Sequence, residues 1–241
     1  MLNALQWLAM SSMLVDHIVQ SPLWLNMEGH SWLLSSTIGR IAYPLYAGLV
    51  VWTSKTRPST RHLMRLWSLA LIAQIPYLAA MHPDTLSLPL YEWKWNVCVS
   101  LALGASLIQG YQQKQLIVLG MSLCLITLMT GFNIRYDYGL AGILWMCSLA
   151  AVLSITHRLV NYGMRALLTL MTLIIGVMGS YHSMMLSVTV VCATTLMMLL
   201  NFEGYVIREI QCPRAPSWLW RGFYPGHLIC IAGIGLLTAT P

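Results

Sequence analysis

The first apolar stretch of the sequence, Leu2–Gln20, carries two neighbouring titratable residues, Asp16 and His17. Placing an Asp at membrane depth costs on the order of 2.5–3.5 kcal/mol, so such a residue indicates a functional site. Histidine titrates near neutral pH and suits the role of a general base. Residues i and i+1 of a helix do not face each other, so Asp16 is not expected to orient His17 as in a catalytic triad.

Arg40 is expected at the same depth as this pair. A rise of 1.5 Å per residue puts His17 about 22 Å from the start of its helix, in the outer leaflet. Arg40 lies about 10 Å below the outer face on the second apolar segment, so we expect Asp16 to pair with Arg40. Two simpler interpretations stay open: the pair only pins two helices together, and His17 is a packing histidine.

More polar residues begin or precede apolar segments at this outer end, namely Asn96, Arg135, Asp137 and Tyr138. Together they predict one cavity that opens outward. Arg40 or Asn96 is the expected stabiliser of an oxyanion, and Tyr138 or His82 the alternative base.

The composition is that of a membrane protein. Hydrophobic residues make up 58% of the chain and charged residues 8%, and the mean hydropathy is +0.68, which excludes an ordinary soluble domain. The six cysteines are scattered without metal-ligand spacing, so no metal site is expected. The net charge of +6 comes from basic residues in short loops, which favours membrane orientation over nucleic-acid binding.

We therefore predict an all-α, polytopic helical bundle with about nine transmembrane helices, forming one domain over residues 1–241. No cleavable signal is evident, so the first segment is expected to stay attached. The predicted spans are Leu2–Gln20, Leu33–Thr53, Leu63–Ala80, Asn96–Gln109, Gln115–Gly131, Tyr138–Thr156, Arg165–Ser180, Met184–Leu200 and Phe223–Ala239.

Basic residues alternate between successive loops, which predicts the orientation. The loops after the second, fourth, sixth and eighth spans are basic, so they are expected in the cytoplasm, with the N-terminus inside and the C-terminus outward. Their basic residues are Lys55, Arg57, Arg61, Arg65, Lys114, Arg158, Arg165, Arg208, Arg214 and Arg221. No internal repeat of the kind found in many transporters is visible.

Short motifs along nearly the whole chain resemble the TraX family of conjugative-plasmid proteins. They are M-L-V-D-H at the end of the first span, G-R-I-A-Y-P-L-Y at Gly39–Tyr46, R-L-W with A-Q-I-P-Y at Arg65–Tyr77, W-N at Trp95–Asn96, Y-G-L-A-G at Tyr138–Gly142 and F-Y-P-G-H-L at Phe223–Leu228.

The resemblance implies a multi-pass enzyme of the bacterial inner membrane that transfers acetyl from acetyl-CoA to the N-terminal amine of conjugative pilin. Membrane acyltransferases of this wider group need an embedded histidine, and His17 is the matching position. Pilin and membrane lipid are the implied partners. A direct transfer and a covalent acetyl-histidine both stay open.

The phosphates of acetyl-CoA need cations at the cytoplasmic face. The candidates are Arg57, Arg61, Arg65, Arg158, Arg208 and Arg221, although a positive-inside bias alone also explains most of them. His227 stands in a family-like motif and is expected near the cytoplasmic end of the last span, on this cofactor side and out of reach of His17.

Other functions fit the same residues. Asp16, His17 and Arg40 would form the relay of a proton-coupled transporter. A non-enzymatic partner in pilin assembly would use the aromatic residues for docking, although an interfacial belt explains them as well. An acyltransferase that acts on another envelope acceptor is the third alternative.

Overall fold

The structure is a computed structural model that describes residues 2–21, 34–155, 158–177, 184–202, 213 and 215–238. All regular elements in these ranges are helical, which confirms the all-α prediction. The elements are α1 (Leu2–Gln20), the π-helical η2 (Ser35–Gly39), α3 (Arg40–Thr56), α4 (Thr60–Ile72), α5 (Gln74–Met81), the short 3-10 turns η3 (Pro83–Ser87) and η4 (Leu90–Glu92), α6 (Val97–Gln112), α7 (Leu116–Gly131), α8 (Gly139–Val152), α9 (Arg158–Val177), α10 (Met184–Phe202) and α11 (Ser217–Thr238).

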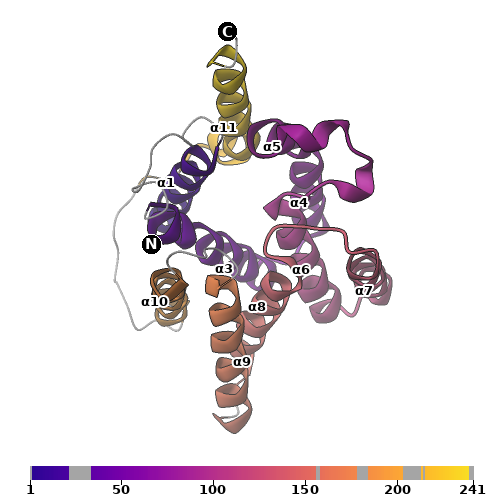
Figure 1. Cartoon of the computed structure of the whole chain (residues 1–241). Helices are drawn as coiled ribbons and strands as arrows, with labels where there is room; N and C mark the ends of the chain where they lie inside the picture. The colour runs from indigo at the N-terminus through magenta and orange to yellow at the C-terminus, as the bar shows by residue number, and fades with distance from the viewer. Residues whose placement is uncertain are drawn as a thin grey trace.

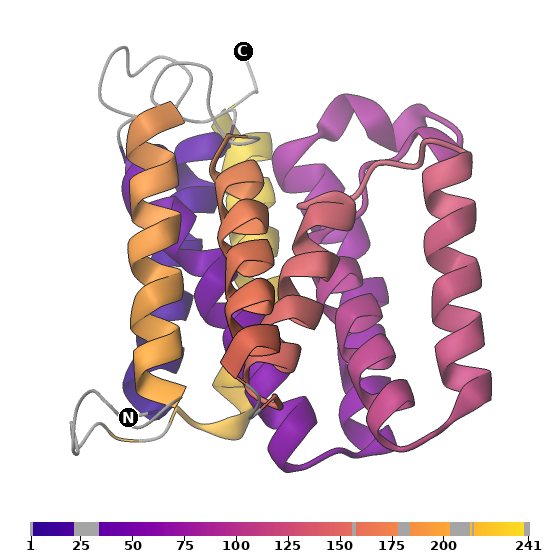
Figure 2. The same cartoon turned by 90° about the horizontal axis from the view of Figure 1, so that it is seen from below.

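The helices form a bundle in which most axes share one direction (Figure 2). Seen end on, α1, α3, α4, α5 and α11 are arranged around a common centre, and α8, α9 and α10 lie beyond α3 (Figure 1). α11 packs on α5 and α1, which brings the two ends of the chain's helical part together. α7 stands at the edge of the bundle and packs on α6 (Figures 1 and 2).

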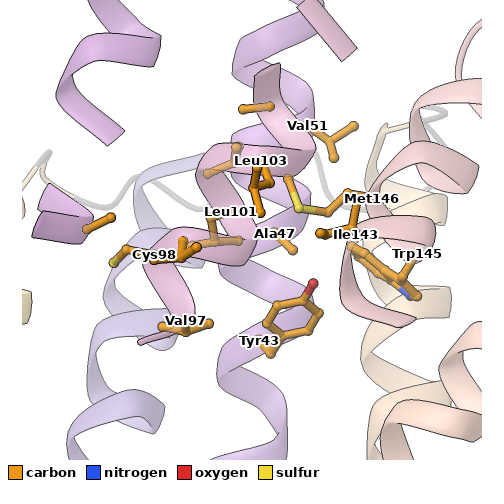
Figure 3. Close-up of a cluster of buried hydrophobic side chains, with 14 of the residues drawn as sticks. Tyr43, Ala47, Val51, Val97, Cys98, Leu101, Leu103, Ile143, Trp145 and Met146 are labelled. Carbon is orange, nitrogen blue, oxygen red and sulfur yellow. The ribbon is translucent and has the colours of Figure 1, made fainter. Parts of the chain in front are cut away.

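A core of apolar side chains joins α3, α6 and α8 (Figure 3). It includes Tyr43, Ala47, Val51, Val97, Cys98, Leu101, Leu103, Ile143, Trp145 and Met146, all buried. Gly104 permits the close approach of α6 and α8, because an added Cβ there would lie 2.6 Å from the sulfur of Met146. This core fixes the helix ends from which the site is built.

The predicted span Leu63–Ala80 is two helices rather than one. α4 ends at Ile72 and α5 starts at Gln74, with a turn at Ala73. Pro76 explains the break, because its nitrogen has no hydrogen to donate to the carbonyl of Ile72 and its ring clashes there.

Two predicted helix starts were also wrong. α9 begins at Arg158 rather than Arg165, and α11 begins at Ser217 rather than Phe223. The predicted spans began only where the polar residues give way to an apolar run, but a helix extends as far as its backbone hydrogen bonds extend. Arg165 is accommodated two turns inside α9, where its Nε donates to Asn161 Oδ1 at 3.1 Å.

The outward apolar surface suggests a membrane protein. Large side chains such as Ile117 on α7 and Leu237 on α11 are 79% and 78% exposed. Among the described residues, one continuous stretch, Thr60–Met81, is both long and apolar enough to cross a bilayer, and the apolar segments of the other helices are 10–17 residues long. The number of spans and their orientation therefore remain predictions.

Candidate active site

A cavity of about 350 Å³ lies where helix ends meet at one end of the bundle. Its walls come from the last turns of α1, α5 and α9, the first turns of α3 and α6, and the segment before α8. The lining residues are Met13, Asp16, His17, Gln20, Arg40, Ala42, Tyr43, Tyr46, Tyr77, Met81, His82, Lys94, Val97, Tyr136, Asp137, Tyr138 and Ile175. The structure thus brings Asp16, His17, Arg40 and Tyr138 together, as the depth comparison predicted.

His17 is hydrogen-bonded to a second histidine. Its Nδ1 lies 2.6 Å from Nε2 of His227, and the two rings are nearly parallel with centroids 4.9 Å apart. Nδ1 of His227 lies 2.6 Å from the carbonyl oxygen of Phe223, one turn earlier on α11. Both histidines are buried, with 7% and 8% of their surface exposed.

This chain of contacts assigns the tautomers of the two histidines. A carbonyl oxygen only accepts, so Nδ1 of His227 carries a hydrogen and Nε2 of the neutral ring accepts. The hydrogen between the rings then belongs to Nδ1 of His17. Neutral His17 keeps a lone pair on Nε2 in a ring that lines the cavity, which is the arrangement that a general base needs.

The position of His227 corrects the sequence-based expectation. His227 was placed at the cytoplasmic end of the last span, away from His17. Because α11 starts at Ser217, His227 is ten positions along the helix, a rise of about 15 Å. The hydrogen bond of 3.0 Å from Trp7 Nε1 to the Pro213 carbonyl, together with the contact between His17 and His227, shows that α11 lies beside α1 and runs in the same direction.

Asp16 points to a different set of partners. Its Oδ1 accepts hydrogen bonds from Gln20 Nε2 at 2.5 Å and from Ser35 Oγ at 3.0 Å, so it joins α1 to η2. Gly39 makes this approach possible, because a Cβ there would lie 2.1 Å from Oδ1. The positive charge of Arg40 also acts on the Asp16 carboxylate.

Arg40 and Tyr138 line the same cavity. The Arg40 side chain hydrogen-bonds the hydroxyl group of Tyr138. Tyr138 has a left-handed backbone, φ 61°, directly before α8, a conformation that is strained for a bulky residue. Its ring stacks on Tyr43 at 3.8 Å between centroids, which holds the tyrosine in place. Arg40 is therefore positioned to meet negative charge that develops in the cavity.

A second polar cluster lies in the same cavity, and of its members the sequence had pointed to Asp137 and His82 but not to Lys94 and Tyr77. Lys94 Nζ lies 2.8 Å from Asp137 Oδ1, and the Tyr77 hydroxyl donates to Asp137 Oδ2 at 2.9 Å. His82 Nε2 is 3.4 Å from the same hydroxyl. Partial burial, and then the charge of Lys94, lower the pKa of His82, while Asp137 opposes this shift.

Asn96 has a structural role instead of the predicted catalytic one. It is completely buried and does not line the cavity. Its Oδ1 caps α6 by accepting from the Cys98 amide at 2.9 Å, and its Nδ2 donates to the Ala70 carbonyl and to Gln74 Oε1, each at 2.8 Å. With its amide group used in this way, Asn96 has no donor left for a substrate.

Three of the basic cofactor candidates lie far from the cavity. Arg57, Arg61 and Arg65 are exposed around the junction of α3 and α4. α3 has 17 residues, a rise of about 25 Å, so this junction is at the other end of the bundle from Arg40. Arg158 and Arg221 lie in the first turns of α9 and α11, and Arg208 falls outside the described residues.

A second, apolar groove of about 310 Å³ runs along one face of α11. It is lined by Trp218, Leu219, Gly222, Phe223, Gly226 and His227. An added Cβ at Gly222 or Gly226 would meet nothing within 4 Å. His227 therefore contacts His17 on one side and ends this groove on the other.

Comparison with known proteins gives one family. The family described as TraX protein matches residues 1–235. No curated protein and no solved structure gives a significant match.

Proposed function

The chain belongs to the TraX family, and from that premise we propose that it is a membrane-embedded acetyltransferase acting on conjugative pilin. Family membership supports a role in pilin processing. The proposed reaction moves an acetyl group from acetyl-CoA to the N-terminal amine of pilin, in the bacterial inner membrane. The observation that carries the proposal is the buried His17, which lines a polar cavity together with Arg40 and whose Nδ1 is occupied by His227, so that Nε2 is left as the basic nitrogen.

The proposed chemistry uses each of these groups once. The ammonium form of the acceptor first loses one proton to water. The neutral amine then attacks the thioester carbonyl, and His17 Nε2 accepts the second proton that the nitrogen loses. The carbonyl electrons move onto oxygen, where Arg40 stabilises the negative charge. When the carbon–sulfur bond breaks, the electron pair leaves with the thiolate, which takes the proton back from His17. His227 accepts a hydrogen bond from Nδ1 of His17 throughout.

The donor would approach from the other end of the bundle. Arg57, Arg61 and Arg65 supply cations for its phosphates, and the groove along α11 leads from Trp218 to His227. An extended, flexible thioester arm could lie along this apolar groove, which ends at the catalytic histidine pair. The acceptor amine would reach the polar cavity from its own end of the bundle.

The test is the intact mass of pilin from cells that express the wild-type protein, His17→Ala or His62→Ala. The wild type and His62→Ala are expected to add one acetyl group, because His62 lies on α4 outside the cavity. His17→Ala is expected to lose about 10²-fold or more in acetylation rate, the usual contribution of a general base. Equal membrane abundance by immunoblot separates lost catalysis from lost folding. Full acetylation by His17→Ala at normal abundance would overturn the assignment of the base.

A further inference from the structure

Lys94 and Asp137 form an ion pair inside the cavity that the proposed chemistry does not use. The Lys94 side chain is 39% exposed and the Asp137 side chain 21%. Lys94 follows the short turn η4 and carries its ammonium on a flexible four-carbon stem. A partly exposed pair of this kind contributes little to stability. Replacing Lys94 by another cation as the partner of Asp137 therefore costs little free energy.

Asp137, in contrast, is rigidly held. Its amide donates to the Trp95 carbonyl at 3.0 Å, and its own carbonyl accepts a hydrogen bond from the Ser100 hydroxyl. Tyr77 fixes Oδ2 from α5. The carboxylate thus has a fixed place in the wall, and a carboxylate has room for more than the two donors that it now accepts.

The chemistry of the cluster matches the amine of a substrate. An N-terminal amine has an ordinary pKa of about 7.7–8.0 and arrives mostly as an ammonium ion at neutral pH. A cation that enters a partly buried cavity needs an anionic partner. Asp16, the other carboxylate of the cavity, already accepts from Gln20 and Ser35. Lys94 Nζ itself is a primary alkylammonium, and it shows that Asp137 holds such a group.

We propose, resting on the function proposed above, that Asp137 with Tyr77 is the binding subsite for the primary ammonium of the acceptor, and that Lys94 occupies this subsite until the acceptor displaces it. Lys94 is then an internal substitute for the ligand. The alternative is a purely structural clamp between α5 and the segment before α8.

Peptide binding without acetyl-CoA tests this subsite. The probes are two fluorescent peptides with the N-terminal sequence of the pilin, one with a free amine and one already acetylated. The purified protein in detergent is expected to bind the free amine about tenfold more tightly or better, as one charge-assisted hydrogen bond allows. Asp137→Asn should remove this preference, whereas Lys94→Met should keep or strengthen it.

Each outcome of this experiment supports or overturns the subsite at Asp137. Melting temperatures of the variants check that folding is retained, and the isosteric Asn keeps the backbone contacts of residue 137. A preference for the free amine that persists in Asp137→Asn would overturn the subsite, and so would equal losses in Asp137→Asn and Lys94→Met, which a structural clamp predicts. Binding needs no turnover. A free-amine preference without acetylation would refute the proposed chemistry but support the subsite. Acetylation by Asp137→Asn with an unchanged KM for the pilin peptide would refute the subsite but support the proposed chemistry.

Discussion

The neighbouring residues Asp16 and His17 serve different partners because one helical step turns the side chain by about 100°. Asp16 contacts η2, next to Arg40 in sequence, and His17 contacts α11. His17 therefore has a histidine where a catalytic triad has a carboxylate. A neutral acceptor still fixes the tautomer of the base without placing a buried negative charge beside it.

Substitution of His227 tests this arrangement. His227→Gln retains an acceptor for Nδ1–H of His17 in its side-chain carbonyl, so most of the activity is expected to remain. His227→Leu removes the acceptor and should lower kcat about 10²-fold while the KM for acetyl-CoA changes little. Rates with purified protein, acetyl-CoA and an N-terminal pilin peptide provide the measurement. Equal activity of the Gln and Leu variants would show that His17 needs no oriented partner.

Counting residues along helices was sufficient to predict that Asp16, His17, Arg40 and Tyr138 share one level, because helical rise is regular. It could not predict the contact with His227, which depends on where α11 begins and which helix lies beside it. The sequence carries one signal for the earlier start, Ser217 directly after Pro216. Asn96 was misjudged because a polar residue before an apolar run also describes a helix cap.

At the scale of helices, prolines lie close to the site residues. Pro44 stands one turn after Arg40 in α3, and Pro225 stands two residues before His227 in α11. Each proline leaves the carbonyl group one turn earlier without a helical donor. In α3 this follows the change from the π-helical η2 to α-helix at Gly39 and Arg40. Such local irregularities re-aim side chains, and they occur frequently at functional sites.

The groove along α11 gives a matched pair of glycine substitutions. Gly222 lines the groove, and Gly233 lies on the same helix beyond His227, outside the groove. At both positions an added Cβ would meet nothing within 4 Å. Gly222→Leu should fill the groove and raise the KM for acetyl-CoA about tenfold, the loss of roughly 1.4 kcal/mol of donor binding. Gly233→Leu should leave it unchanged, and both variants should fold, since leucine has the better helix propensity.

Steady-state kinetics at varied acetyl-CoA, with the pilin peptide held in excess, provide the measurement. An unchanged KM in Gly222→Leu would show that the donor takes another route to His17. A tenfold rise in Gly233→Leu as well would indicate a general effect of leucine on α11.

At the scale of the whole molecule, the sequence predicted the helical class because hydrophobic content and spacing determine it. The break at Ala73 and the irregular helix lengths depend on local proline and packing. α6, for example, has 16 residues, a rise of about 24 Å, which is shorter than the ~30 Å core of a bilayer. The predicted orientation rests on loop charge alone, and in the structure Arg57, Arg61 and Arg65 lie at the opposite end of the bundle from the polar cavity.

The last prediction concerns the orientation in the membrane, because the proposed function needs Arg57, Arg61 and Arg65 in the cytoplasm and the cavity on the outer side. A reporter that is active only in the cytoplasm should be active when fused after Arg57 or after Lys114, in the basic loops between α3 and α4 and between α6 and α7. Fusions after Asp84 or after Asn133, at the cavity end, should be silent. A second reporter that is active only outside the cytoplasm should give the opposite pattern at all four sites, which controls for fusion proteins that fail to accumulate. Active cytoplasmic reporters after Asp84 and Asn133 would put His17 on the cytoplasmic side and contradict an acceptor that arrives from outside.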